Sequence, residues 1–170
     1  MSARVVIIMG SLADREHVDK IARACQEFGL EVEMRVASAH KSPRYLLEML
    51  AGFEAGPDSV VYITVAGRSN ALGGMVDASV AAPVITCPPV SSAFGGADLY
   101  SSLRMPTGVA PLVVLEPTAA ALAAAKILAL SDSALRQRIC AYQASLTEQI
   151  INDDSALGLE QTRSMGERTK

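Results

Sequence analysis

His40 and Lys41 stand side by side in the stretch VASAHKSPR (36–44) and carry the side chains in this chain best suited to acid–base chemistry. A histidine takes and releases a proton near neutral pH, and a lysine beside it is a compact positive charge for an anion. The other histidine, His17, falls on the polar side of an expected helix, which favours a structural role. An isolated histidine is more often structural than catalytic, so the elements that position His40 must decide its role.

Strand and helix patterns alternate along the chain. Ser42 and Pro43 supply an N-cap and a first-position proline for one helix. Strands are predicted at 5–9, 32–36, 59–67, 82–89 and 110–116, and later helices at 98–105 (a turn or two), 119–130 and 131 to about 151. The alternation predicts a three-layer α/β/α sandwich around a parallel sheet of about five strands, flavodoxin-like or Rossmann-like. We expect one domain over 1–151 and a polar, frayed tail over 152–170.

Polar and glycine residues follow four of the predicted strands. These loops are 10–14, 38–42, 66–70 and the one that begins at Pro88-Pro89. Because ligands of open parallel sheets bind at the carboxyl ends of the strands, the four loops should meet at one site. Such a site could hold a phosphate and a sugar and transfer a proton. Taken singly, each feature also has a plain reading: Ser11 or Asp14 as a helix cap, Lys41 and Arg68 as solvated charges, Gly67 as turn chemistry.

Composition excludes several classes of function. The chain has 170 residues, half of them hydrophobic, and a formal charge of -3, which gives no basic footprint for nucleic acid. Cys25, Cys87 and Cys140 lie far apart and form no CxxC or Cys/His cluster, which argues against a metal site and favours a reducing, cytoplasmic setting. The N-terminal apolar run is too short for a signal peptide or a membrane span. No GxGxxG or P-loop pattern is present.

Five motifs in order resemble the phosphoribosylaminoimidazole carboxylase family of purine biosynthesis. They are MGSLAD, SAHKSP, VAGRSNALGGM, PVITCPP and SSLRMPTG, and the resemblance runs from about Val5 to Leu130. Class II of this family adds CO2 to aminoimidazole ribonucleotide (AIR), giving carboxyaminoimidazole ribonucleotide (CAIR). Class I is a mutase acting on the N5-carboxy isomer. Lys41, Arg68-Ser69-Asn70 and Cys87-Pro88-Pro89, with no histidine in the central loop, resemble class II.

The resemblance implies roles for individual residues. His40 would carry the proton at the ring carbon, beside Lys41 as the second catalytic residue. The implied substrate-binding residues are Gly10, Ser11, Asp14, Ser38, Ala39, Gly67, Arg68, Ser69, Asn70 and Leu72. Ser11, Asp14, Ser38 and also Lys41 would hold phosphate and ribose, and Gly67, Ser69 and Asn70 the new carboxylate. Ala13 replaces the second serine of the family turn GSxSD, so one hydroxyl is missing there.

The resemblance also implies partners and cofactors. The substrates would be AIR and CO2, with no cofactor and no metal, and with no nucleic acid or membrane as partner. The chain would associate with copies of itself, as a tetramer or octamer. Two alternatives remain: a class I mutase, and a non-catalytic nucleotide-binding or regulatory domain.

Overall fold

Five parallel strands form the centre of the protein in a computed structural model that describes residues 3–90 and 92–167. The strands are β1 (Ala3–Met9), β2 (Glu31–Val36), β3 (Ser59–Val65), β4 (Val84–Thr86) and β5 (Leu112–Val113). Their order in the sheet is β2-β1-β3-β4-β5, and all pairs are parallel. This is the flavodoxin-like order, whose switch point lies between β1 and β3. The predicted fold class is therefore confirmed.

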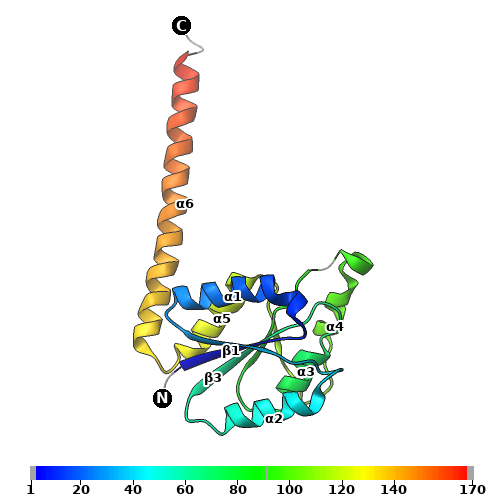
Figure 1. Ribbon diagram of the computed structural model, residues 1–170. Coiled ribbons are helices and arrows are strands. Elements are labelled where there is room, and N and C mark those ends of the chain that lie inside the picture. The colour runs from blue at the N-terminus through cyan, green and yellow to red at the C-terminus, as the bar shows by residue number, and fades with distance from the viewer. Residues whose placement is uncertain (1–2, 91, 168–170) are drawn as a thin grey trace.

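Helices cover both faces of the sheet (Figure 1). α1 (Arg15–Glu27) and α5 (Pro117–Leu128) pack on one face, while α2 (Pro43–Glu54) and α3 (Ala71–Asp77) pack on the other. Because side chains alternate along a strand, β1 divides its residues between the two cores. Val5, Ile7 and Met9 enter the core with α1 and α5, and Val6 and Ile8 enter the core with α2. A buried sheet of this kind explains the continuous apolar runs in the sequence.

The last two strands are shorter than the sequence patterns at 82–89 and 110–116. β4 has three residues and β5 has two. Pro83 and Pro88 flank β4, and Pro111 directly precedes β5. A proline has no N–H to donate to a neighbouring strand, so the ladder stops there. The long connection between β4 and β5 forms a 3-10 helix (Ala93–Leu99) and a short α4 (Tyr100–Leu103).

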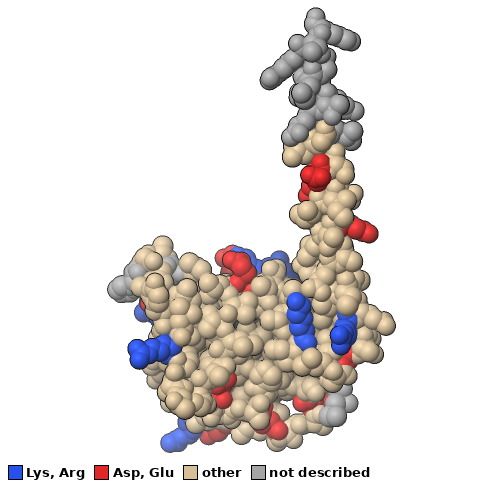
Figure 2. All heavy atoms as spheres, turned by 180° about the vertical axis from the view of Figure 1, so that it is seen from behind, with Lys and Arg blue, Asp and Glu red and all other residues tan. Residues whose placement is uncertain are grey.

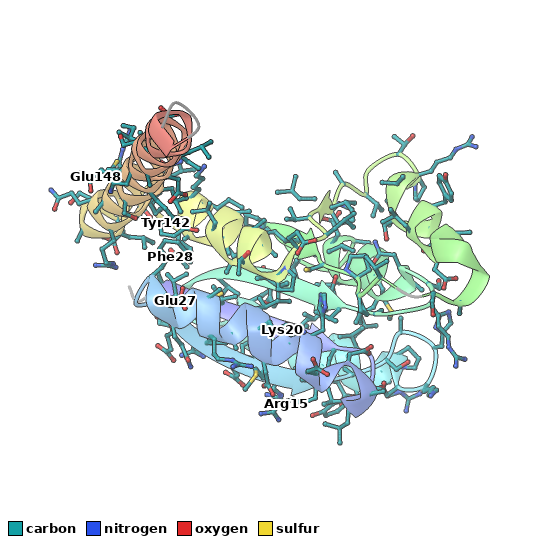
Figure 3. All side chains as sticks on the ribbon, turned by 90° about the horizontal axis from the view of Figure 1, so that it is seen from above. Arg15, Lys20, Glu27, Phe28, Tyr142 and Glu148 are labelled. Atoms are coloured by element: carbon teal, nitrogen blue, oxygen red, sulfur yellow. The ribbon has the colours of Figure 1, made fainter. Side chains whose placement is uncertain are left out.

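The C-terminal helix α6 (Ser133–Glu167) is longer than predicted. The sequence suggested a helix to about residue 151 and then a frayed tail, but α6 continues as a helix of 35 residues. Its base is anchored on the end of α1: the Phe28 and Tyr142 rings meet edge to face at 5.3 Å, and Arg138 Nε donates to the Phe28 carbonyl at 2.9 Å (Figure 3). Beyond this anchor, α6 projects away from the body (Figure 1).

Charges of both signs are scattered over the face shown in Figure 2. Across residues 3–90 and 92–167, no helix combines the length and apolar character needed to cross a membrane. All three cysteines are free thiols, with Cys25 and Cys87 buried and Cys140 exposed.

Candidate active site

A cleft of about 970 Å³ opens at the carboxyl ends of the strands, where the sequence predicted the site. Its lining residues come from the loops after β1, β2, β3 and β4. The cleft brings together nine predicted residues: Gly10, Ser11, Asp14, Ser38, His40, Lys41, Gly67, Arg68 and Ser69. They are separated by as many as 59 positions in the chain, so only the parallel sheet can place them side by side.

The first wall of the cleft is the turn from β1 into α1. The Gly10 N–H donates to the Val65 carbonyl at 2.9 Å, which ties this turn to the end of β3. Ser11 is extended, and a 3-10 turn (Leu12–Asp14) then leads into α1. The Ser11 hydroxyl donates to Asp14 Oδ2 at 3.5 Å, a long contact. Burial raises the pKa of the Asp14 carboxyl, and Ser11 and His17 oppose this shift.

The second wall carries His40 on a loop that is braced at its base. Ser42 Oγ accepts from the Ser38 N–H at 3.0 Å and donates to the Ser38 carbonyl at 3.3 Å. The Ser42 N–H also donates to that carbonyl, at 2.9 Å, and the Lys41 N–H donates to Ser38 Oγ at 3.3 Å. Pro43 then begins α2, as predicted, although the Ser42 hydroxyl closes the loop instead of capping the helix. His40 and Lys41 are exposed at the tip of this rigid turn.

The third wall is the loop after β3, and Asn70 holds its shape. Asn70 is only 5% exposed, and its Oδ1 accepts from the Gly73 N–H and from the Thr86 hydroxyl, both at 3.2 Å. Thr86 Oγ1 in turn lies 3.1 Å from Thr64 Oγ1. This buried network links β3, β4 and α3. Asn70 therefore shapes the loop from below, and Arg68 and Ser69 face the cleft.

Gly67 lies where two other walls come close to the central loop. A Cβ added to Gly67 would be 3.3 Å from Pro89 Cγ and 3.5 Å from Asp14 Oδ1. A Cβ there would be tight against Pro89 in the loop after β4 and in ordinary contact with Asp14 in the first wall. The close approach of Pro89 favours a glycine at this position.

Three predicted site residues do not line the cleft. Ala39 and Leu72 pack with the α2 core, where Leu72 is 3% exposed, and Asn70 is buried as described above. Leu72 follows Asn70 by two positions on α3, and the helix turns its side chain inward to the sheet. The prediction for these residues rested on their nearness in sequence to the loops, which does not fix side-chain direction.

The cleft also has lining residues that the sequence did not single out as site residues: Ala13, Ala66, Pro89, Val90, Ala93 and Asp98. Asp98 is the most polar of them, and it comes from the 3-10 helix of the β4–β5 connection. The loop that begins at Pro88-Pro89 and the motif SSLRMPTG, which starts three residues after Asp98, had both indicated that this connection was near the site. Beside the cleft is a small, mainly apolar cavity of about 50 Å³, bordered by Pro88, Leu99 and Leu115 among others.

His17 is not on a solvated face, contrary to the sequence interpretation. Its ring is half-buried, and Nε2 lies 3.4 Å from Cys87 Sγ. Burial lowers the pKa of His17, and Lys20 adds to this, while the Cys87 backbone, Asp14 and Glu116 oppose it. In the part of the chain that the structure describes, no group of three or more His, Cys, Asp or Glu residues could hold a metal ion.

The fold and the cleft define an α/β protein of the flavodoxin-like type with an open cleft at its switch point. Residues 4–149 match the AIR carboxylase family model, and the chain belongs to that family, an enzyme family of purine biosynthesis. The phosphoribosylaminoimidazole carboxylase of Archaeoglobus fulgidus is 49% identical over 154 residues, which cover 91% of this chain and 84% of the relative. The one from Treponema denticola is 48% identical over 157 residues, covering 92% and 99%.

Solved structures and longer relatives agree with this assignment. The crystal structure of Treponema denticola PurE has a TM-score of 0.90 and 48% identity, and it covers 91% of this chain and 98% of that one. The bifunctional phosphoribosylaminoimidazole carboxylase/phosphoribosylaminoimidazole succinocarboxamide synthetase of Rattus norvegicus is 43% identical over 129 residues. That match covers 76% of this chain and 30% of the relative.

Proposed function

We propose that this protein is a class II AIR carboxylase, which adds CO2 to the ring carbon of AIR to give CAIR, without a cofactor. The observation that carries the proposal is the exposed His40 on a rigid turn at the cleft, facing the same space as Gly67, Arg68 and Ser69. Lys41 and the Arg68-Ser69-Asn70 loop resemble the class that uses CO2 directly. The names of the relatives from Archaeoglobus fulgidus and Treponema denticola also support a carboxylase.

The nucleotide would be held by the first wall. Backbone N–H groups at the start of the turn into α1, with the helix dipole behind them, suit a phosphate. Ser11 adds a hydroxyl, and Lys41 a positive charge from the second wall. Asp14 would accept hydrogen bonds from ribose hydroxyls. Since Ala13 offers no hydroxyl, Ser11 and the backbone carry more of the phosphate binding here than in a GSxSD turn.

CO2 has no charge to bind, so it would need an apolar space that excludes water. The cavity of about 50 Å³ beside the cleft has such a lining and shares Gly67, Arg68 and Pro89 with it. From there CO2 would meet the ring carbon, with the Ser69 hydroxyl and the backbone of Gly67 close to the new carboxylate. The main work of such a site is positioning.

His40 would complete the reaction as the proton carrier. The enamine-like ring carbon attacks the CO2 carbon, and the amine nitrogen takes up the positive charge of the intermediate. That ring carbon still carries its proton. His40 removes it as a base, and the electron pair of the broken C–H bond restores the aromatic ring. In reverse, protonated His40 returns the proton to the carbon before CO2 leaves.

A paired-substrate assay tests this function. Purified protein is given AIR with bicarbonate, and separately the N5-carboxy isomer, and CAIR formation is followed. Turnover of AIR with bicarbonate, but not of the isomer, supports class II. Turnover of the isomer, but not of AIR, would make the protein a class I mutase. Binding of AIR with no turnover of either substrate would favour a regulatory nucleotide-binding domain. His40→Asn should keep AIR binding and lose turnover, and a variant that still turns over would exclude His40 as the proton carrier.

We further propose that the protein associates with copies of itself through α6. The projecting turns carry exposed apolar residues at Leu146, Ile150 and Leu157, which share one helix face. A helix that extends alone into water gains little from propensity, so a second copy would stabilise this face. Light scattering should give a multiple of the 17.8 kDa chain mass, and Leu146→Glu with Ile150→Glu should reduce it. An unchanged mass would exclude α6 as the contact.

The location we propose is the cytoplasm. The three free thiols fit a reducing compartment. The proposed partners are the small molecules AIR and CO2, and neither nucleic acid nor a membrane has a part in the reaction.

A further inference from the structure

His17 and Cys87 join two elements that are far apart in sequence. His17 lies in the first turn of α1, and Cys87 directly follows β4. The His17 Nε2 to Cys87 Sγ distance is 3.4 Å, and Cys87 Sγ donates to the Leu115 carbonyl at 3.5 Å. A thiol has one proton, and the Cys87 thiol donates it in its hydrogen bond to the Leu115 carbonyl. With that proton engaged, the sulfur accepts from His17 Nε2 in the tautomer of the neutral imidazole that carries its proton there.

The pair is a neutral hydrogen-bonded contact and not a reactive thiolate. Cys87 is 0% exposed, and burial, with Glu116 as a lesser cause, raises its pKa to about 12. Burial lowers the pKa of His17, with a further lowering by Lys20, against the Cys87 backbone, Asp14 and Glu116. At neutral pH, an uncharged ring therefore faces an uncharged thiol. Nucleophilic chemistry of the kind that an imidazolium–thiolate pair performs is excluded, and a mechanical role remains.

Two cleft-lining residues, Asp14 and Pro89, lie close in sequence to the two partners of this contact. Asp14 precedes His17 by three positions and so lies on the same side of the helix start. Pro89 follows Cys87 by two positions. Asp14 and Pro89 both close on Gly67, at 3.5 Å and 3.3 Å from where its Cβ would be. A shift of α1 relative to the loop after β4 would therefore change the space around Gly67 and the position of the Asp14 carboxylate together.

We propose that His17 is a positioning residue, whose hydrogen bond to Cys87 fixes the start of α1 against the loop after β4 and so places Asp14 for the nucleotide. This inference rests on the proposed function, in which Asp14 holds the ribose of AIR. His17 itself is not among the residues that line the cleft. It acts through Asp14 and the spacing of the two walls.

Matched variants separate the hydrogen bond from the bulk of the ring. His17→Leu keeps an apolar side chain of similar reach but has no donor. His17→Gln keeps an N–H that can reach the sulfur. Cys87→Ala removes the sulfur acceptor and leaves His17 and the backbone of residue 87 in place. Glu16→Gln is the control, because the neighbouring Glu16 side chain is 85% exposed and forms an ion pair with Lys20 on the helix surface.

The dissociation constant of AIR is measured by calorimetry in bicarbonate-free buffer, which does not depend on turnover. We expect His17→Leu and Cys87→Ala to weaken AIR binding about tenfold, His17→Gln to remain within about threefold of the wild type, and Glu16→Gln to be unchanged. Thermal unfolding is measured on the same samples. Variants that lose thermal stability but bind AIR like the wild type would overturn the positioning role.

A double-mutant cycle tests whether the effect passes through Asp14. Asp14→Asn should weaken AIR binding, and His17→Leu added to it should weaken binding little further, because the carboxylate to be placed is gone. Fold-changes that multiply would overturn the inference, as would normal binding by Asp14→Asn. Wild-type protein that binds AIR but forms no CAIR would refute the proposed carboxylase and leave this cycle interpretable. Wild-type protein that does not bind AIR overturns both.

Discussion

Gly73 is the position at which the structure makes its sharpest quantitative prediction. A Cβ added to Gly73 would come within 3.0 Å of Asn70 Oδ1 and of Thr86 Oγ1, both of which are buried oxygens. Real Cβ atoms do not approach oxygens so closely. Gly73→Ala must therefore push Asn70 and Thr86 aside and break the hydrogen bonds that they share.

The expected destabilisation follows from the hydrogen bonds that Gly73→Ala breaks and from the crowding that it introduces. Two hydrogen bonds contribute about 1 kcal/mol each, and overpacking a rigid site adds about 1–3 kcal/mol. Replacing a helical glycine by alanine returns roughly 0.5–1 kcal/mol. The free energy of unfolding should thus fall by about 3 kcal/mol, which for a chain of this size lowers Tm by roughly 6–12 °C.

Gly74→Ala is the matched control. It changes the adjacent glycine of the same helix, where a Cβ would be 3.5 Å from Met105 Sδ, an ordinary contact with a flexible side chain. We expect Gly74→Ala to leave Tm unchanged or to raise it slightly. Thermal and urea unfolding of both variants and the wild type provide the measurement. A Gly73→Ala variant with the stability of Gly74→Ala would refute the close packing of this network.

Three further predictions use other parts of the site. Burial lowers the pKa of His17 from its ordinary 6.5, so the unfolded chain binds more protons at this residue than the folded chain does. The free energy of unfolding should therefore fall as the pH drops below about 6.5. Urea unfolding at pH 7.5 and at pH 5.5 measures this fall, which should be smaller in His17→Gln than in the wild type. Ser42→Ala should lower the free energy of unfolding by about 1 kcal/mol, because it removes the hydroxyl that braces the His40 turn. The looser turn should lower kcat more than it raises KM, whereas Ser42→Thr should retain activity. Equal kinetics in the two variants would contradict this prediction. Burial raises the pKa of Cys25 and of Cys87 to about 12, so each should be a thiolate in about one molecule in ten thousand at pH 8. Both thiols should therefore react with a disulfide reagent at least about 100-fold more slowly in the native protein than in the urea-unfolded protein. Stopped-flow absorbance measures the two rates, and equal rates would refute the prediction.

More of the fold than of the candidate site could be predicted from the sequence. Buried parallel strands need apolar runs, and the loops at their carboxyl ends need polar and glycine residues, so both could be predicted from local patterns. The two ends of β4 were harder to predict, because Pro83 and Pro88 shorten the strand within a longer apolar segment. The length of α6 was also not predicted, because its polar second half resembles a tail. That half is helical without packing on the body of the protein, so it needs no apolar stripe facing a core.

Side-chain direction was the main thing that the sequence could not give. Leu72 and Asn70 sit in the central motif beside Ser69, yet the start of α3 turns Leu72 and Asn70 into the protein and leaves Ser69 at the cleft. His17 was assigned to a polar face, but in the folded protein it is half-buried against Cys87, while its neighbours Arg15 and Glu16 are exposed. Asp98 reaches the cleft from the 3-10 helix of the long β4–β5 connection.

The two sides of the cleft are therefore held by different kinds of contact. The His40 turn is closed by Ser38 and Ser42, four positions apart, and such a local brace is visible in the sequence as soon as the turn is recognised. The Gly67 loop depends on partners from β4 and α1, which only the folded sheet brings within reach. A substitution far from the cleft, in β4 or α1, should hence disturb the Gly67 side and leave the His40 turn intact. Under the proposed function, proton transfer by His40 and nucleotide binding on the Gly67 side would then be damaged separately, which is what the His40, His17 and Gly73 variants together would measure.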